Sequence, residues 1–165
     1  MKSINIFTDG AVPNNQKQGN RKGGVGVFFG NDDPRNISWS IKETNDVKVT
    51  NQVCELLACI QGLETVISTE KIGKRDIIIY TDSMYIVNTI TEWANKWEKN
   101  NWKKADNKPV QNLELVKKLY FLSRNLKVSY NHVLAHKSPP VKDSEDYFKW
   151  YGNYMADKLA VEATK

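Results

Sequence analysis

The stretch DIIIYTDS, residues 76–83, decides the fold class of this chain. Its centre, Ile77 to Tyr80, is a short, continuous and largely β-branched apolar run, which is typical of a strand buried on both faces of its sheet. Asp82 and Ser83 follow directly and are suited to cap a helix. The stretch therefore predicts an α/β protein in which an acidic residue lies at the carboxyl end of an inner strand.

The sequence on both sides of this stretch alternates between strand and helix patterns. Residues 51–68 carry apolar side chains at helical spacing behind a cap at Thr50 or Asn51, and predict a long central helix. The other predicted elements are strands at 2–9, 25–29, 36–42 and 126–134, helices at 83–99, 110–124 and 153–163, and polar loops at 12–24 and 137–150. The order β-β-β-α-β-α-α-β-α predicts a mixed five-stranded sheet flanked by helices, beginning with an antiparallel meander.

Four acidic residues occupy positions that seldom need an acid. They end the first strand, lie early in the central helix, follow the inner strand and lie in the last helix: Asp9, Glu55, Asp82 and Asp157. Taken singly, Glu55 could complement a helix dipole, Asp82 could be a cap and Asp157 could face solvent. Together they can meet at the carboxyl ends of the parallel strands, where carboxylates repel one another unless cations bind. Oxygen ligands without a Cys or His cluster favour Mg²⁺ or Mn²⁺, so we expect metal-assisted chemistry on phosphate.

The net charge of +5 is unevenly distributed along the chain. Between Lys96 and Lys118 there are seven lysines against three acidic residues, interleaved with Trp93, Trp97 and Trp102. Lysines beside large aromatic rings are typical of a nucleic-acid surface. The alternative is that the lysines solvate a helix face while the tryptophans belong to the core.

The length and the cysteine content indicate one domain, residues 1–165, without cross-links. Cys54 and Cys59 are five residues apart on one predicted helix and cannot pair with each other, which suits a reducing compartment. No signal sequence and no apolar run of about 20 residues is present, so we expect an intracellular protein, cytoplasmic or nuclear, and a monomer.

Five sequence blocks occur in order along almost the whole chain: IFTDGA, TNQVCELLA, YTDSMYIVNTITEW, KWEKNNWKKADNKPVQN and GNYMADKLA. With them the chain resembles type 1 ribonuclease H, more closely its eukaryotic members. The resemblance implies a ribonuclease H-like fold and an endonuclease that hydrolyses the RNA strand of RNA/DNA hybrids, leaving 5′-phosphate and 3′-hydroxyl ends. It also implies that Asp9, Glu55, Asp82 and Asp157 bind two Mg²⁺ ions, for which Mn²⁺ can substitute.

The resemblance extends to hybrid binding, with departures from the family pattern. Lys48 stands where eukaryotic members usually have an arginine, which keeps the charge and loses the bidentate fork. The residues implied in contacts to the hybrid are Asn15, Lys48, Thr50, Asn51, Gln52, Met84, Tyr85, Trp93, Trp97, Lys99, Lys103, Lys104 and Asn112.

His136 is the remaining implied catalytic residue. Family members often carry GHSG and a short loop at this point, whereas this chain has AHKSPP, and fifteen residues separate His136 from Gly152. The longer loop could hold His136 differently or reach the substrate itself, and it would bring Trp150 and Tyr151 as further contacts. His132 alternates with its strand neighbours and is expected to be structural.

Three alternatives remain at this point. A module that binds hybrids without cleaving them would share the basic aromatic stretch but would not need four acids. An integrase-, transposase- or resolvase-like nuclease would keep the carboxylates but has no reason to carry WEKNNWKKADNKPVQN. A ribonuclease H domain of a retroelement polyprotein is the third, although Met1 directly before the first strand favours a free-standing gene product.

Overall fold

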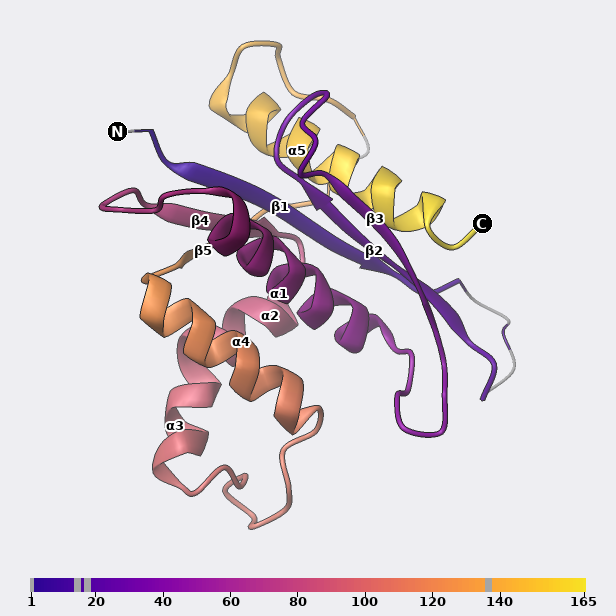
Figure 1. Cartoon of the computed structure of the whole chain (residues 1–165), viewed down its shortest axis with the longest axis vertical. Helices are drawn as coiled ribbons and strands as arrows, with labels where there is room; N and C mark the ends of the chain where they lie inside the picture. The colour runs from indigo at the N-terminus through magenta and orange to yellow at the C-terminus, as the bar shows by residue number, and fades with distance from the viewer. Residues whose placement is uncertain (1, 14–15, 17–18, 136–137) are drawn as a thin grey trace.

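A five-stranded mixed sheet forms the centre of the fold in the computed structural model, which describes residues 2–13, 16, 19–135 and 138–165. The strand order is β3-β2-β1-β4-β5 (Figure 1). β1 pairs with β2 and β2 with β3 in antiparallel fashion, while β1–β4 and β4–β5 are parallel. The strands are β1 (Ile4–Ala11), β2 (Lys22–Phe28), β3 (Ile37–Lys42), β4 (Ile77–Thr81) and β5 (Ser129–His132). The meander and the parallel inner strand are confirmed.

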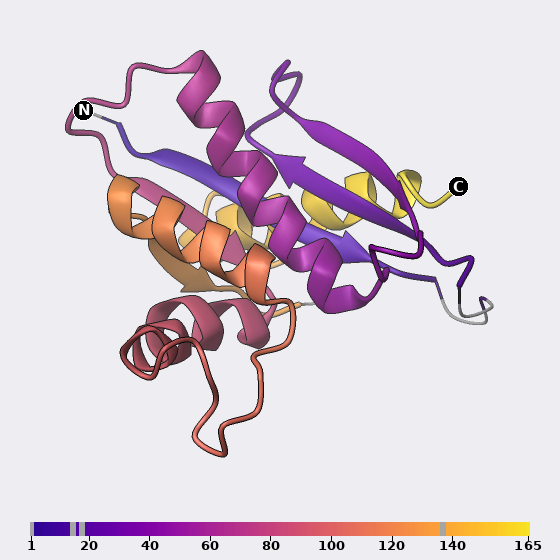
Figure 2. The same ribbon diagram turned by 60° about the horizontal axis from the view of Figure 1, so that its bottom comes forward.

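Helices cover both faces of the sheet. α1 packs on β1 and β2 and also contacts α4, while α5 crosses the opposite face against β1, β2 and β3 (Figures 1 and 2). The helical segments are α1 (Asn51–Thr69), α2 (Met84–Asn88), the π-helical turn η1 (Thr89–Trp93), α3 (Ala94–Lys99), α4 (Leu113–Leu126) and α5 (Glu145–Glu162). Because α2, η1 and α3 follow one another without a break, the order of elements is the predicted one. No helix among the described residues is long and apolar enough to cross a membrane.

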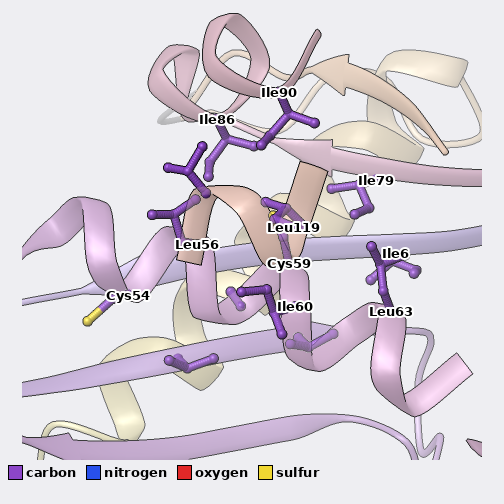
Figure 3. Close-up of a cluster of buried hydrophobic side chains, with 14 of the residues drawn as sticks. Ile6, Cys54, Leu56, Cys59, Ile60, Leu63, Ile79, Ile86, Ile90 and Leu119 are labelled. Carbon is purple, nitrogen blue, oxygen red and sulfur yellow. The ribbon is translucent and has the colours of Figure 1, made fainter. Parts of the chain in front are cut away.

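The main core lies between the sheet and the α1–α4 layer. Ile6 and Ile79 point from the strands toward Ile60 and Leu63 of α1, and Leu119 closes the cluster from α4 (Figure 3). All five side chains are at most 1% exposed. Burial of an aliphatic side chain of this size stabilises the fold by roughly 1.5–3 kcal/mol, so this layer holds the central helix firmly against the two parallel strands.

The second face of the sheet brings α5 unusually close to β2. A Cβ atom on Gly24 would lie 1.9 Å from the Ala160 carbonyl oxygen, and one on Gly26 would lie 2.1 Å from the Ala156 carbonyl oxygen. Neither distance is possible between non-bonded atoms, so only glycine fits at these two strand positions. The absence of side chains lets the backbone of α5 rest directly on the strand and fixes the height of the helix above the sheet.

The structure corrects the predicted start of the last helix. α5 begins at Glu145 and not near residue 153, so much of the predicted 137–150 loop is helical. The Ser144 side chain accepts a hydrogen bond from the Tyr147 backbone N–H, and Glu145 and Asp146 lie in the first turn, where the helix dipole favours acids. The polar composition of the segment led to the prediction of a loop, although the helix begins there with an ordinary side-chain cap.

Smaller differences occur at other boundaries. β2 begins at Lys22, inside the predicted 12–24 loop, because the Gln16 side chain hydrogen-bonds both the N–H and the carbonyl of Lys22. α4 begins at Leu113, three residues later than predicted. The helix predicted at 83–99 is interrupted by η1, a π turn that the apolar spacing did not reveal.

Candidate active site

Three carboxylates meet at the carboxyl ends of the two inner parallel strands. Asp9 lies in β1, Asp82 directly follows β4, and Glu55 reaches the same point from the second turn of α1. One oxygen from each of these three side chains lies within 4.8 Å of the other two. Ser83 caps α2, so Asp82 is not needed as a cap. Glu55 lies beyond the first turn of α1, in which an acid would complement the helix dipole. The structural alternatives for these two acids therefore lose their support.

The cluster is electrostatically unfavourable in the absence of cations. Asp9 is 5% exposed and Glu55 8% exposed. Burial raises the pKa of Asp9 well above its usual range, and the charges of Glu55 and Asp82 raise it further. Burial and the charge of Asp82 likewise raise the pKa of Glu55. Burial also raises the pKa of Asp82, against an opposing hydrogen bond from Asn153. Each carboxylate would therefore gain stability from a nearby positive charge.

Asp157 lies at the exposed border of this cluster. It is not one of the three carboxylates with oxygens within 4.8 Å of one another, yet its charge contributes to the raised pKa of Asp9, Glu55 and Asp82. A hydrogen bond between the Asp157 and Asp9 side chains adds to the rise for Asp9. All four predicted acids are therefore close together, with Asp157 on the solvent side.

The cluster fits a divalent cation. Glu55 Oε2 is buried and has no hydrogen-bond partner among the residues that the structure describes. A buried carboxylate oxygen without a donor is costly, and a cation would satisfy it. The donor set contains carboxylate oxygens and no thiolate, which suits hard cations such as Mg²⁺ or Mn²⁺. Which metal binds stays a prediction.

Two further residues touch Asp82. The Asn153 side chain hydrogen-bonds the Asp82 carboxylate and is itself 9% exposed. His132 Nε2 lies 3.3 Å from the Asp82 backbone oxygen, and the His132 ring lowers the pKa of that carboxyl. The expected structural role of His132 agrees with its position at the end of β5. Its proximity to Asp82 has no signal in the sequence.

A groove beside the cluster collects several of the predicted hybrid contacts. It has a volume of about 430 Å³ and lies between the start of α1 and the α2–α3 segment. The Trp93 and Trp97 rings are 6.1 Å apart at 43°, and Trp93 is 38% exposed. The predicted contacts that line the groove are Gln52, Tyr85, Trp93, Trp97 and Lys104. The tryptophans thus border a groove on the surface, although Trp97 also packs on the core.

The predicted phosphate contacts lie around the start of α1. Lys48 and Thr50 line a pocket of about 400 Å³, and Lys48 together with Asn112 lines a neighbouring apolar pocket of about 750 Å³. Asn112 has a left-handed backbone with φ 57° and makes no cap to α4 through its side chain. Arg21, which the sequence pattern did not single out, lines the first of these pockets and adds a cation beside Lys48.

Four other predicted contacts among the described residues line none of the three pockets above. Asn51 and Met84 are exposed at the first turns of α1 and α2, and Lys99 and Lys103 are exposed on the segment after η1. Asn15 and His136 lie outside the described residues. The roles of all these side chains in binding stay predictions.

The family model for RNase H matches residues 1–165. The chain belongs to the ribonuclease H family. The ribonuclease H of Schizosaccharomyces pombe is 36% identical over 155 residues, which cover 94% of this chain and 50% of that protein. The ribonuclease H of Maricaulis maris is 33% identical over 162 residues, which cover 98% and 93% respectively. This member of the ribonuclease H family thus spans about half the length of its Schizosaccharomyces pombe relative and nearly all of its bacterial one.

Solved structures support the ribonuclease H fold. The foamy viral protease-reverse transcriptase, solved in complex with an RNA/DNA hybrid, superposes with a TM-score of 0.70 at 19% identity, over 99% of this chain and 20% of that one. At that identity the likeness concerns the fold alone. The expected ribonuclease H-like fold and the expected family are confirmed.

Asn153 is a residue of the site that sequence reasoning missed although a signal for it exists. It lies four residues before Asp157, so the two side chains point the same way on one helix. An amide one turn from a proposed metal ligand is such a signal. Arg21 has no comparable signal, because its place beside Lys48 depends on the pairing of β2 with β3.

Proposed function

We propose that this chain is a ribonuclease H that hydrolyses the RNA strand of RNA/DNA hybrids with two divalent cations, preferably Mg²⁺. The observation that carries the proposal is the mutual approach of Asp9, Glu55 and Asp82 within 4.8 Å, beside a groove lined by tryptophans and Lys104. Family membership supports the substrate, since the similar proteins are themselves named ribonuclease H. Residues 1–165 would act as a single catalytic domain.

The four acids would hold the cations, and Asn153 would keep Asp82 in position through its hydrogen bond. The Gly10 N–H donates to Asp9 Oδ1 at 2.9 Å and orients that carboxylate in the same way. Two cations held by these four carboxylates would supply the charge that activates a water and stabilises the leaving 3′ oxygen in an in-line displacement. Products of this chemistry carry 5′-phosphate and 3′-hydroxyl ends.

The groove residues would bind the two strands differently. The Trp93 and Trp97 rings offer flat surfaces to sugars, and the exposed lysines contact phosphates of the DNA strand. Gln52 lines the groove near the start of α1, where an amide can hydrogen-bond groups in the minor groove. The 2′-hydroxyl is the group that distinguishes RNA from DNA there, so we place strand selection at this point.

The decisive experiment is incubation with end-labelled RNA/DNA, RNA/RNA and DNA/DNA duplexes, with and without Mg²⁺. We expect cleavage of the RNA strand in the hybrid alone, and none in excess EDTA. Ligation and phosphatase assays on the products identify their ends. Cutting that persists in EDTA, or equal cutting of double-stranded DNA, contradicts the proposal. Tight hybrid binding without any cleavage would favour the alternative of a non-cleaving hybrid-binding module.

A further inference from the structure

The first half of α5 carries a row of stacked aromatic rings that the proposed reaction does not use. Tyr147 stacks on Tyr151 with centroids 6.1 Å apart and an interplanar angle of 14°, and it packs tilted on Trp150 at 5.5 Å. Trp150 stacks on Tyr154 at 5.3 Å and 12°. The four rings therefore form a continuous row along the helix, in the order Tyr151, Tyr147, Trp150 and Tyr154. An N-terminal half of α5 made only to cover the sheet would not need this row.

One end of the row is fixed to the sheet. The Tyr151 hydroxyl donates a hydrogen bond of 2.6 Å to Asn31 Oδ1, and its ring meets Phe28 edge-on at 6.0 Å. Tyr151 thereby anchors the row to the end of β2 and the turn that follows it. The rings behind it are held in place before any ligand arrives, which lowers the entropy lost on binding.

The other end of the row is open and adjacent to the candidate active site. Tyr154 is 48% exposed. Its neighbour Asn153 hydrogen-bonds Asp82, and Asp157 lies three residues after Tyr154, on the adjoining turn. A ligand that stacked on the Tyr154 ring would therefore lie within about one helical turn of the carboxylates, and would be continuous with a strand bound there.

Of the charged residues along α5, Lys158 favours the same end, where bound cations would neutralise the neighbouring Asp157. Lys158 is exposed four residues beyond Tyr154, on the same side of the helix, and can contact a phosphate. Glu145 and Asp146 lie in the first turn, at the far end of the row, where they would repel a phosphate backbone. A nucleic-acid strand would therefore meet the row at Tyr154.

We propose that Tyr154, supported by Trp150, stacks on an unpaired nucleobase of a strand that extends beyond the RNA/DNA hybrid. Within a duplex both faces of a base are covered by its neighbours, so an exposed protein ring can stack only on a base that is unpaired. The inference rests on the proposed function for the position of the hybrid. It adds a preference for hybrids that carry single-stranded extensions, of RNA or of DNA.

The test compares the affinities of a blunt hybrid and of hybrids with unpaired RNA or DNA extensions at either end. Binding is measured by fluorescence anisotropy with Mg²⁺ in an Asp9→Asn background, and the readout is the ratio of the two dissociation constants. We expect at least one extension to tighten binding by roughly 5- to 100-fold, the range for one stacked base. Tyr154→Ala should bring that ratio close to one, whereas Tyr154→Phe, which keeps the ring, should preserve it.

Phe148→Leu provides the matched control. Phe148 lies on the same helix and is 45% exposed, but it packs on Phe7 and Tyr80 at 5.3 and 5.7 Å, away from the row. The ratio of dissociation constants measured for Phe148→Leu should equal that of the parent. No gain from any extension, or a gain that survives Tyr154→Ala, overturns the proposal.

A second measurement separates this proposal from the proposed function. The affinities of the parent and of Tyr154→Ala for the isolated single-stranded extensions are determined as well. If the protein with all four acids fails to cleave hybrids, the proposed function falls. Loss of single-strand affinity in Tyr154→Ala would still support the stacking site, and equal affinities would contradict it. Circular dichroism melts confirm that each variant is folded.

Discussion

At the scale of single residues, Asp9 has the most unfavourable surroundings in the candidate site. Its carboxylate is buried beside two others, and its pKa is raised first by burial and then by the charges of Glu55 and Asp82. A raised carboxyl pKa means that the fold prefers the protonated form, so the charge at neutral pH reduces stability until a cation binds. The negative charge that would bind a cation therefore lowers the stability of the cation-free protein.

Asp9→Asn should separate the effect of this charge on cleavage from its effect on stability. The substitution keeps the volume and removes one of the repelling charges, so cleavage should be abolished while hybrid binding is retained. In EDTA the melting temperature should rise above that of the parent protein, and Mg²⁺ should raise it less than it raises the parent's. Calorimetry with and without Mg²⁺ measures both effects. Full activity of the variant would show that the carboxylate cluster is not the metal site.

His136→Ala should behave differently. No metal requires this side chain, and general acid–base assistance is typically worth about 10²- to 10⁴-fold, so cleavage should slow without vanishing. Single- and multiple-turnover rates distinguish proton transfer from product release. Rates equal to those of the parent would mean that the longer segment before α5 has removed His136 from the chemistry.

The sequence could predict the four acids because each stands at a place set by local pattern. Asp9 follows the apolar part of β1, which continues two residues further to Ala11, and Asp82 follows β4. Glu55 and Asp157 lie in helices. The sequence could not predict that Asp157 faces solvent and still lies close to the other three acids. That position depends on the height and rotation of α5 over the sheet, which no local pattern encodes.

At the scale of elements, the helical segment from Met84 to Lys99 differs most from an ideal helix. The π turn from Thr89 to Trp93 places one more residue in that turn than an α-helix would. All residues after it are rotated by about 100° relative to an uninterrupted helix. Trp93 ends this turn, and Trp97 follows it at a spacing of four, so the two share one groove while the helix continues to pack on α4. Apolar spacing alone could not predict this, because short π turns leave the periodicity on either side intact.

The lysines that follow give an element-scale prediction. Lys99, Lys103 and Lys104 are exposed, and none of them forms an ion pair among the described residues. Replacing all three by alanine should weaken hybrid binding and flatten its salt dependence. The log–log slope should fall by about 0.9 for each phosphate that is no longer neutralised by a lysine. Affinities measured across a salt series give the slope, and turnover at saturating substrate should change much less.

The control for this prediction is the pair Lys71 and Lys74, in the segment between α1 and β4, at the end of β4 opposite to Asp82. Alanine at these two positions should leave the slope unchanged. A triple variant with the parent's salt dependence would return the stretch to the role of a solvated face.

At the scale of the whole molecule, the two glycines of β2 that contact α5, Gly24 and Gly26, help to determine where that helix lies. Gly26→Ala should show this, since the added Cβ would meet the Ala156 carbonyl at 2.1 Å and force the helix outward. Overpacking of this kind costs roughly 1–3 kcal/mol of stability. Because Asn153 and Asp157 move with α5, activity should fall further than the loss of stability explains. Chemical denaturation gives the stability, and cleavage at saturating Mg²⁺ gives the activity.

Gly62→Ala is the matched control for this prediction. Its added Cβ would meet Ile6 Cγ2 at 2.9 Å, on the face of the sheet that α1 covers, so it overpacks the core without touching α5. Its activity should follow its stability alone. If Gly26→Ala also loses no more activity than its stability explains, the glycine patch does not position the two α5 side chains.

The topology was predictable because hydrophobic pattern and the order of elements leave few arrangements of a mixed sheet. The first half of α5 was missed for a physical reason. Its residues are polar or aromatic, and its helicity depends on the Ser144 cap and on packing against Phe7 and Phe28. Those ring contacts join segments more than a hundred residues apart and are invisible to a local pattern.

The close contact of α5 with Gly24 and Gly26 affects which segments of such a protein can vary in length. These contacts lie in the second half of the helix, at Ala156 and Ala160 on either side of Asp157. The position of Asp157 is thus set by contacts of α5 itself with the sheet, which include Gly152 against Phe7, and not by the chain between β5 and α5. Insertions and deletions between β5 and α5 can therefore accumulate without displacing Asp157. Changes in that segment can therefore alter the contacts to substrate while Asp157 keeps its position.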